Sequence, residues 1–301
     1  MLNKKIDYIA SFISIMIVVI FAVLGSANKM INGIPILLIF VIISFIIHWL
    51  IFIPSYIFKT EKFYDITGTI AYICIFYVSY LITNKINLEN SLYIRSYLTL
   101  IMITIWAIRL GGFLFIRVFS VGEDKRFKYV KTSFSKFFLY FTISGVWVFL
   151  TTCNALTIII NNSSLSNDIF LKIGFFIWLI GFLIEVISDT QKKYFRKNTK
   201  NKNQFINSGL WKISRHPNYF GEILQWFGIS IISLPILTGW EFITLISPIF
   251  VIILLTKISG INILEKNADE KWGSSKIYNE YKNNTPILVP FITPNKKSNE
   301  K

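Results

Sequence analysis

The stretch "IPILLIFVIISFIIHWLIFIPSY", residues 34–56, contains no Asp, Glu, Lys or Arg. It is long enough to cross the hydrocarbon core of a bilayer as a helix, which takes about 20 apolar residues. Seven further segments have spanning length or slightly less: 8–24, 66–83, 96–116, 137–160, 169–188, 222–237 and 240–258. The sequence therefore predicts an all-α, polytopic membrane bundle of about seven to eight transmembrane helices, and we draw eight.

The composition of the whole chain leads to the same class. Of 301 residues, 53% are hydrophobic and 16% are charged, which gives more apolar surface than one soluble core can bury. The longest polar stretches, 189–221 and 259–301, are too short and too poor in apolar residues for a second core. We expect a single membrane domain over residues 1–301, with the first apolar segment retained as a helix and not removed as a signal peptide.

The formal charge of +15 is explained by membrane topology. With the N-terminus in the cytoplasm, 26 of the 31 Lys and Arg residues fall on the cytoplasmic side: two before Asp7, two in 59–65, six in 117–136, eight in 189–221 and eight from 257 onward. This asymmetry follows the positive-inside rule and predicts that both termini are cytoplasmic. We expect contact with membrane lipids, no nucleic acid and no obligate protein partner. The membrane would be the endoplasmic reticulum in a eukaryote and the inner or plasma membrane in a bacterium.

The cysteines and one histidine carry no predicted chemistry. Cys74 and Cys153 lie in separate apolar segments without CxxC spacing, so neither a disulfide nor a zinc site is expected. We predict no metal site. His48, within the second span, is interpreted as a hydrogen-bonded bundle residue and not as a catalyst.

A charge within the fourth span needs a partner. Arg109 lies in "IWAIRLGGFLFIRV", where an isolated cation is costly, so a carboxylate or a ligand should neutralise it. Asp65, Glu185 and Glu222 are the carboxylates that could do so. Asp65 could instead cap the start of the third span.

The sixth span ends in a stripe of charged residues. Glu185, Asp189, Lys193 and Arg196 recur at i, i+4, i+8 and i+11, so one helix face carries carboxylates deep in the membrane and cations near its surface. This face is a candidate binding surface for a charged ligand. The alternative is a set of salt bridges at the interface, with Lys and Arg extending toward water.

The segment "RHPNYFGE", residues 215–222, has the properties of an anion site. Pro217 fixes its own backbone angle and disfavours helix at the residue before it, so a helix should begin at Pro217. The free amide groups and the positive dipole at that start favour an anion, and Arg215 and His216 lie just outside it.

The following helix offers polar groups below that anion. Asn218 and Glu222 lie four residues apart on one face, and Gly221 and Gly228 should let neighbouring backbones approach closely. The pattern predicts a site for an elongated ligand with one anionic end. The alternative is an interfacial belt formed by aromatic side chains such as Tyr219, with Glu222 solvated.

At these residues the sequence resembles the membrane-bound steroid 5-alpha-reductase superfamily, and within it the subfamily DUF1295. The matching pieces are collinear over about residues 63–291, and the piece at 209–228 is the most specific: "FYDITGTIAYI", "RLGGFLFIRV", "GEDKRF", "EVISDTQKKYFRK", "GLWKISRHPNYFGEILQWFG", "SGINILEKNADEKW" and "YNEYKNNTPILVPF". The resemblance implies a steroid-reductase-like region at 63–291 and a cofactor-binding half at about 170–291.

The resemblance also implies an activity. It suggests a reductase that takes hydride from NADPH and reduces a carbon–carbon double bond of a lipid or steroid-like enone. Asp189, Arg196, Asn218 and Glu222 match cofactor-contacting positions. We expect the cofactor site to comprise Glu185, Asp189, Lys193, Arg196, Arg215, His216, Asn218, Tyr219 and Glu222.

The proton donor and the competing functions remain open. Trp106 falls where the steroid reductases have a tyrosine, and tryptophan is no general acid, so Tyr64 and Tyr219 are the candidate catalytic residues. "RHP" also resembles isoprenylcysteine and phospholipid methyltransferases, so a lipid methyltransferase that uses S-adenosylmethionine is the alternative. A transporter or scaffold without chemistry is the third hypothesis.

Overall fold

The structure is a computed structural model that describes residues 2–86, 92–121, 127–166 and 168–292. Ten α-helices make up most of these residues: α1 (Leu2–Gly25), α2 (Ile36–Ile57), α3 (Tyr64–Ile86), α4 (Ile94–Val121), α5 (Phe134–Asn161), α6 (Ile169–Lys197), α7 (Pro217–Ser233), α8 (Ile246–Ile253), α9 (Ile261–Trp272) and α10 (Lys276–Asn284). The short elements are a ribbon of β1 (Met30–Ile31) and β2 (Ile34–Pro35), the 3-10 turns η2 (Thr199–Asn201), η3 (Gly209–Lys212), η4 (Leu234–Ile236) and η5 (Gly239–Leu245), and the π-turn η6 (Leu254–Ile258).

Eight helical segments of the described chain are long and apolar enough to cross a membrane. They confirm the prediction of an all-α, polytopic bundle, and α2 matches the predicted span 34–56 closely. The cytoplasmic position of both termini stays a prediction. Of the motif "GEDKRF", only Phe127 belongs to the described residues.

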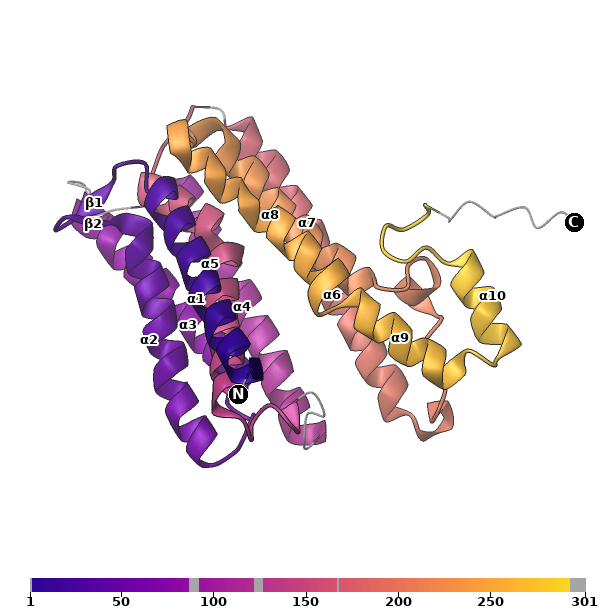
Figure 1. The fold of residues 1–301 in the computed structure, drawn as a ribbon. Helices are drawn as coiled ribbons and strands as arrows, with labels where there is room; N and C mark the ends of the chain where they lie inside the picture. Colours follow the sequence, from indigo (N-terminus) through magenta and orange to yellow (C-terminus); the bar gives the residue numbers. More distant parts are fainter. Residues whose placement is uncertain (1, 87–91, 122–126, 167, 293–301) are drawn as a thin grey trace, which may run out of the picture. The chain divides into compact units, whose positions relative to one another are not determined.

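The chain divides into two compact units, 1–171 with 232–247, and 172–231 with 248–301. In the first unit, α5 packs against each of α1, α2, α3 and α4 (Figure 1). Buried residues make up 83% of its membrane-spanning window. Small and hydroxyl-bearing side chains such as Ser144, Gly145, Ala155 and Thr157 permit this packing on every side. The division into compact units does not test the prediction of one membrane domain over 1–301, which stays a prediction.

A close approach between α2 and α5 places His48. A Cβ on Gly145 would lie 2.9 Å from the Phe45 ring, so the helices touch at that point. His48 is fully buried there, with Nδ1 2.7 Å from the Ser44 carbonyl oxygen and Nε2 3.0 Å from Ser144 Oγ. The interpretation of His48 as a hydrogen-bonded bundle residue is confirmed.

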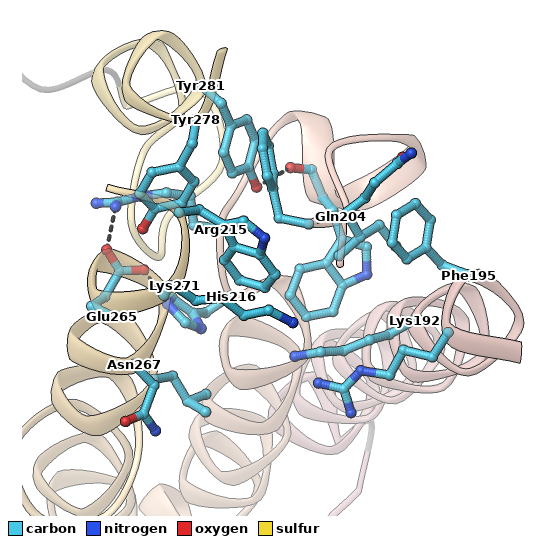
Figure 2. Close-up of a pocket in the computed structure, with 17 residues that line it drawn as sticks. Lys192, Phe195, Gln204, Arg215, His216, Glu265, Asn267, Lys271, Tyr278 and Tyr281 are labelled. Atoms are coloured by element: carbon cyan, nitrogen blue, oxygen red, sulfur yellow. Dashed lines mark hydrogen bonds and ion pairs between the residues drawn. The ribbon is translucent and has the colours of Figure 1, made fainter. Parts of the chain in front are cut away.

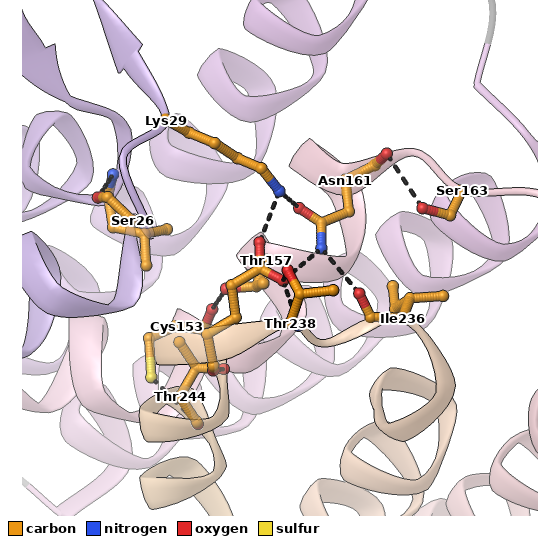
Figure 3. A network of polar contacts seen from close by, with 11 residues as sticks. Ser26, Lys29, Cys153, Thr157, Asn161, Ser163, Ile236, Thr238 and Thr244 are labelled. Carbon is orange, nitrogen blue, oxygen red and sulfur yellow. Dashed lines mark hydrogen bonds and ion pairs between the residues drawn. The ribbon is translucent and has the colours of Figure 1, made fainter.

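A buried carboxylate ties the segment 232–247 to the rest of the first unit. Glu241, 1% exposed, accepts hydrogen bonds from Lys29 Nζ at 2.5 Å, Asn161 Nδ2 at 3.1 Å and the Thr238 amide at 2.9 Å. Figure 3 shows Lys29, Asn161 and Thr238 converging from three parts of the chain. The Thr238 hydroxyl also donates, at 3.2 Å, so four donors offset the cost of burying this charge.

A second buried ion pair lies at the start of α4. Arg95 is 1% exposed and donates to the Asp168 carboxylate and to the Ile232 carbonyl oxygen. Asp168 also accepts from the Leu171 amide at 3.0 Å.

Both cysteines, Cys74 and Cys153, carry free thiols, as expected.

In the second unit, α6 and α7 meet backbone to backbone. A Cβ on Gly221 would lie 2.5 Å from the Gly181 carbonyl oxygen, and one on Gly228 would lie 2.6 Å from that of Gly174. The predicted close approach at Gly221 and Gly228 is confirmed. The four glycines are spaced seven residues apart in each helix, so the two helices stay in contact over two turns.

Candidate functional site

The candidate site is built around the residues that precede α7. Helix α7 begins at Pro217, as predicted. Just before it, Arg215 Nη1 donates to Glu265 Oε2, and His216 Nε2 lies 2.8 Å from Glu265 Oε1 (Figure 2). The carboxylate comes from α9, 49 residues further along the chain than His216. One carboxylate thus engages both Arg215 and His216, the two side chains expected at the helix start.

The C-terminal segment holds the same residues through the backbone. The Arg215 amide donates to the Pro286 carbonyl oxygen at 2.9 Å, and Ser214 Oγ donates to that of Leu288 at 2.7 Å. The Tyr281 hydroxyl donates to the Trp211 carbonyl oxygen at 2.7 Å. We call residues 285–292 the C-terminal strap. Hydrogen bonds from both the strap and α10 therefore fix the approach to α7.

A pocket of about 320 Å³ opens beside these residues, at the lower end of the range for ligand sites. Its walls come from the end of α6, the segment 204–216, α9 and α10 (Figure 2). The side chains that define its chemistry are four cations, one carboxylate, one imidazole and six aromatic rings: Lys192, Arg196, Arg215, Lys271, Glu265, His216, Phe195, Phe205, Trp211, Trp272, Tyr278 and Tyr281.

Four of the six aromatic rings form one connected wall around Phe205. The centroid of Phe205 lies 5.3 Å from that of Tyr278, 5.3 Å from that of Tyr281 and 5.9 Å from that of Trp272. Trp272 Nε1 donates to the Asn203 carbonyl oxygen at 2.6 Å, which fixes the ring. Such rings offer flat surfaces on which a planar group can stack.

Cations stand over two of these rings. Lys192 Nζ lies 4.4 Å from the centroid of Trp211, and Lys271 Nζ lies 4.8 Å from that of Trp272. With Glu265 as the one carboxylate among the lining residues, the pocket carries a surplus of positive charge. A flat, anionic ligand is the class that this wall favours.

Burial sets the protonation of the polar groups. It lowers the pKa of His216; the hydrogen bond to Glu265 opposes this shift, and the charges of Lys192 and Arg215 reinforce it. Burial also raises the pKa of Tyr278 and Tyr281 well above the usual range, so both phenols stay protonated at neutral pH.

The structure distributes the predicted cofactor residues over two environments. Three of them line the pocket: Arg196, Arg215 and His216. The other six lie outside the pocket lining, with Glu185 and Asp189 buried on α6, Lys193 exposed on α6, and Asn218, Tyr219 and Glu222 partly buried on α7. Their cofactor roles stay predictions.

Two of the predicted residues have contacts that constrain their roles. Glu185 Oε2 accepts from Gln225 Nε2 at 2.7 Å, across the α6–α7 glycine contact. The ring of Tyr219 stacks on His216, with centroids 5.7 Å apart and planes 13° from parallel. Glu185 therefore already contributes to helix packing, and Tyr219 supports the imidazole at the pocket wall.

The other candidate proton donor, Tyr64, belongs to the first unit. Its ring packs against Phe127 and Phe141, with centroids 4.8 and 5.2 Å away, and its hydroxyl donates to the Tyr140 carbonyl oxygen at 3.2 Å. In the same unit, the guanidinium of Arg109 lies 5.7 Å from the Phe113 centroid. The sequence analysis expected a carboxylate or a ligand beside Arg109, and it did not predict this cation–π contact.

Several pocket residues were not singled out from the sequence. Glu265 and Lys271 of α9, and Tyr278 and Tyr281 of α10, sit in polar helices that read as surface helices. A usable signal was present, because Tyr278 and Tyr281 are three residues apart and share one face of α10. The partner of that face could not be read from local sequence.

Comparison with known proteins assigns the chain to a family by its sequence. Residues 49–285 match the family described as "Protein of unknown function (DUF1295)". The chain belongs to that family. No solved structure matches it.

The curated relatives match part of the chain. It is 30% identical over 128 residues to "3-oxo-5-alpha-steroid 4-dehydrogenase 1" of Bos taurus, and 25% identical over 119 residues to the protein of that name in Rattus norvegicus. Those alignments cover 42% and 40% of this DUF1295 chain and 44% and 40% of the relatives. It is also 33% identical over 64 residues to "Probable O-methyltransferase ustE" of Ustilaginoidea virens, with 21% of this chain and 22% of the relative covered.

Proposed function

We propose that this DUF1295 protein is a membrane-embedded, NADPH-dependent oxidoreductase that reduces a carbon–carbon double bond of a lipid or steroid-like enone. The observation that carries the proposal is the pocket, which is lined by four cations, six aromatic rings and one carboxylate. The similarity to proteins named 3-oxo-5-alpha-steroid 4-dehydrogenase 1 supports the reaction class.

The residues present fit one end of a dinucleotide. Lys192, Arg196 and Lys271 are placed to neutralise phosphates, and the aromatic wall around Phe205 suits a stacked purine. Arg215, held by Glu265, adds a fourth cation at the start of α7. When bound, NADPH would supply the hydride.

The residues beside the pocket would orient the rest of the cofactor. Asn218 and Glu222 lie one turn apart on α7 and are partly buried, and Asp189 is buried on α6. We assign these amide and carboxylate groups to the ribose or nicotinamide end. Glu185 and Lys193 are proposed as further contacts on the same α6 stripe.

The substrate would enter from the bilayer, because an apolar lipid partitions there. Reduction of an enone also needs a proton, and a phenol is a suitable general acid in a water-poor site. We propose Tyr219 for this role, since it stacks on the pocket residue His216. Tyr64, whose hydroxyl is used by the Tyr140 carbonyl oxygen, is the second candidate.

One observation favours a different reaction. The match to a probable O-methyltransferase is consistent with a lipid or prenylcysteine methyltransferase that uses S-adenosylmethionine. Its adenosine could also stack on the aromatic wall, but it carries no phosphate. The cluster of Lys192, Arg196 and Lys271 therefore favours the dinucleotide.

Titration of the purified, full-length protein decides between the two ligands. In detergent, NADPH should bind and raise the melting temperature, and added salt should weaken its binding because the contacts are ionic. S-adenosylmethionine should bind much more weakly. Tight binding of S-adenosylmethionine without any binding of NADPH would reverse the choice.

Charge-removing variants test where the dinucleotide binds. Lys192→Gln and Lys271→Gln should each weaken NADPH about tenfold, since each removes one charge-assisted contact. Lys266→Gln is the matched control on α9, because its side chain is 78% exposed and lies outside the pocket lining. Equal effects of Lys271→Gln and Lys266→Gln would place the dinucleotide elsewhere.

A further inference from the structure

His216 presents a buried atom that the described residues leave without a hydrogen-bond partner. The side chain is 5% exposed and lines the pocket, and its Nδ1 is the unpaired atom. Buried polar atoms in folded proteins are nearly always paired. Because His216 lines the pocket, this unpaired nitrogen is a candidate contact for a group that the ligand brings.

Glu265 determines what kind of group that is. A carboxylate can only accept hydrogen bonds, so His216 Nε2, 2.8 Å from Glu265 Oε1, must carry the hydrogen. The other carboxylate oxygen accepts a hydrogen bond from Arg215, whose positive charge neutralises the carboxylate. In a neutral ring, the second nitrogen then has a lone pair and accepts.

The surroundings keep that ring neutral. The charged and titratable groups that face it are Glu265 from α9, Lys192 from α6, Arg215 next to it in sequence, and Tyr219 stacked against it from α7. Burial is the largest influence and lowers the pKa of His216, and the two cations act in the same direction. Nδ1 is therefore an acceptor at neutral pH, and not a donor for phosphate.

We propose that Glu265 locks His216 in the Nε2–H tautomer, so that Nδ1 accepts a hydrogen bond from an amino or hydroxyl group of the bound nucleotide. Glu265 is then a positioning residue and His216 a direct ligand contact. The inference rests on the proposed function, because it assumes a nucleotide in the pocket. It adds one requirement. The ligand must carry an N–H or O–H donor for His216 Nδ1 in addition to the anionic groups that contact the cations.

The chain contains its own reference for this tautomer. It has two histidines, and His48 makes the opposite arrangement. Its Nδ1 lies 2.7 Å from the Ser44 carbonyl oxygen, which can only accept, so His48 carries its hydrogen on Nδ1 and accepts from Ser144 through Nε2. Two histidines in opposite neutral tautomers give distinguishable nitrogen signals.

Nitrogen-15 NMR of the full-length protein, labelled at histidine and held in nanodiscs at pH 7.5, tests the lock without any ligand. We expect one ring protonated at Nδ1 and one at Nε2, and His216→Gln should remove the second. Glu265→Gln should shift the His216 signals, whereas Glu270→Gln, 65% exposed on the same helix, should leave them unchanged. A cationic His216, or hydrogen on its Nδ1, overturns the proposal.

Adding NADPH, and separately S-adenosylmethionine, tests the contact. A bound donor should move the Nδ1 signal of His216 and leave that of His48 in place. If only S-adenosylmethionine moves it, the oxidoreductase function is wrong and the contact holds. If neither ligand moves it, the contact is wrong, whatever the tautomer.

Two substitutions of His216 distinguish the roles of its two ring nitrogens. An asparagine amide reaches the place of Nδ1, and a glutamine amide reaches that of Nε2. For the ligand that binds, His216→Asn should therefore keep more affinity than His216→Gln, which should lose about tenfold. Affinity should also fall as the medium is acidified. The reverse order of the variants, or tighter binding in acid, overturns the contact.

Discussion

Gly221 packs so closely against Gly181 that a Cβ added to Gly221 would lie 2.5 Å from the Gly181 carbonyl oxygen. Such a Cβ would also lie 2.7 Å from the amide nitrogen of Glu185. One turn further along α7, Gln225 donates to Glu185 at 2.7 Å. The glycine contact therefore also sets the distance between the two helices that carry most of the predicted cofactor residues.

Gly221→Ala should destabilise the protein. The added methyl group meets two backbone atoms that cannot rotate away, so α6 and α7 must separate, at a cost of roughly 1–3 kcal/mol. Thermal unfolding in detergent measures the loss. Gly68→Ala is the matched control within α3, because nothing lies within 4 Å of its Cβ, and it should stabilise slightly. Equal melting temperatures for the two variants would contradict the contact.

The ion pair of Arg95 and Asp168 should be expensive to break. Asp168→Asn can keep the hydrogen bond to the Leu171 amide but leaves the buried guanidinium without its countercharge, which costs roughly 3–5 kcal/mol. The double variant with Arg95→Met should recover part of this loss. Unfolding of both variants in detergent checks the expectation, and Glu270→Gln, in an exposed pair, should cost less than about 1 kcal/mol. No recovery in the double variant would count against the pair.

Stability should fall in mild acid because of His216. Its pKa in the fold is lowered, so the unfolded chain binds the proton more tightly and stability rises with pH between the folded value and about 6.5. The melting temperature should therefore drop as the pH is lowered from 7.5 to 5.5. His216→Gln should reduce this drop. A larger drop in that variant would mean that the imidazole is charged in the fold.

Asn218→Ala and Glu222→Ala should weaken NADPH binding while the protein stays folded. Both side chains are partly buried on the α7 face that we assign to the reactive end of the cofactor. Isothermal titration measures the affinity, and circular dichroism confirms the helix content. The exposed residue Phe227, replaced by Leu on the same helix, serves as the control. Unchanged affinity in both alanine variants would remove this face from the site.

Features that depend on local sequence were predictable. The spans follow from apolar length, the start of α7 follows from Pro217, and the helix contact follows from Gly221 and Gly228. His48 was correctly interpreted because a polar residue buried in an apolar span must find a nearby hydrogen bond.

Features that depend on distant partners were not predictable. Glu265 lies about 50 residues from Arg215 and His216, and nothing in its own helix distinguishes it from Glu270. The partner of Glu241 was equally unpredictable, because Lys29 lies 212 residues away. The sequence analysis singled out Arg109 as a charge that needs a partner, whereas the partners of Glu265 and Glu241 emerge from the fold alone.

The strap has a consequence for the order in which the molecule matures. Because Pro286 and Leu288 hold the backbone of Arg215 and Ser214, the pocket lacks two of its supports until the ribosome has passed Leu288. All eight hydrophobic segments are synthesised earlier. All of the hydrophobic segments are therefore complete before the pocket has its last two supports, and the pocket is finished only late in synthesis.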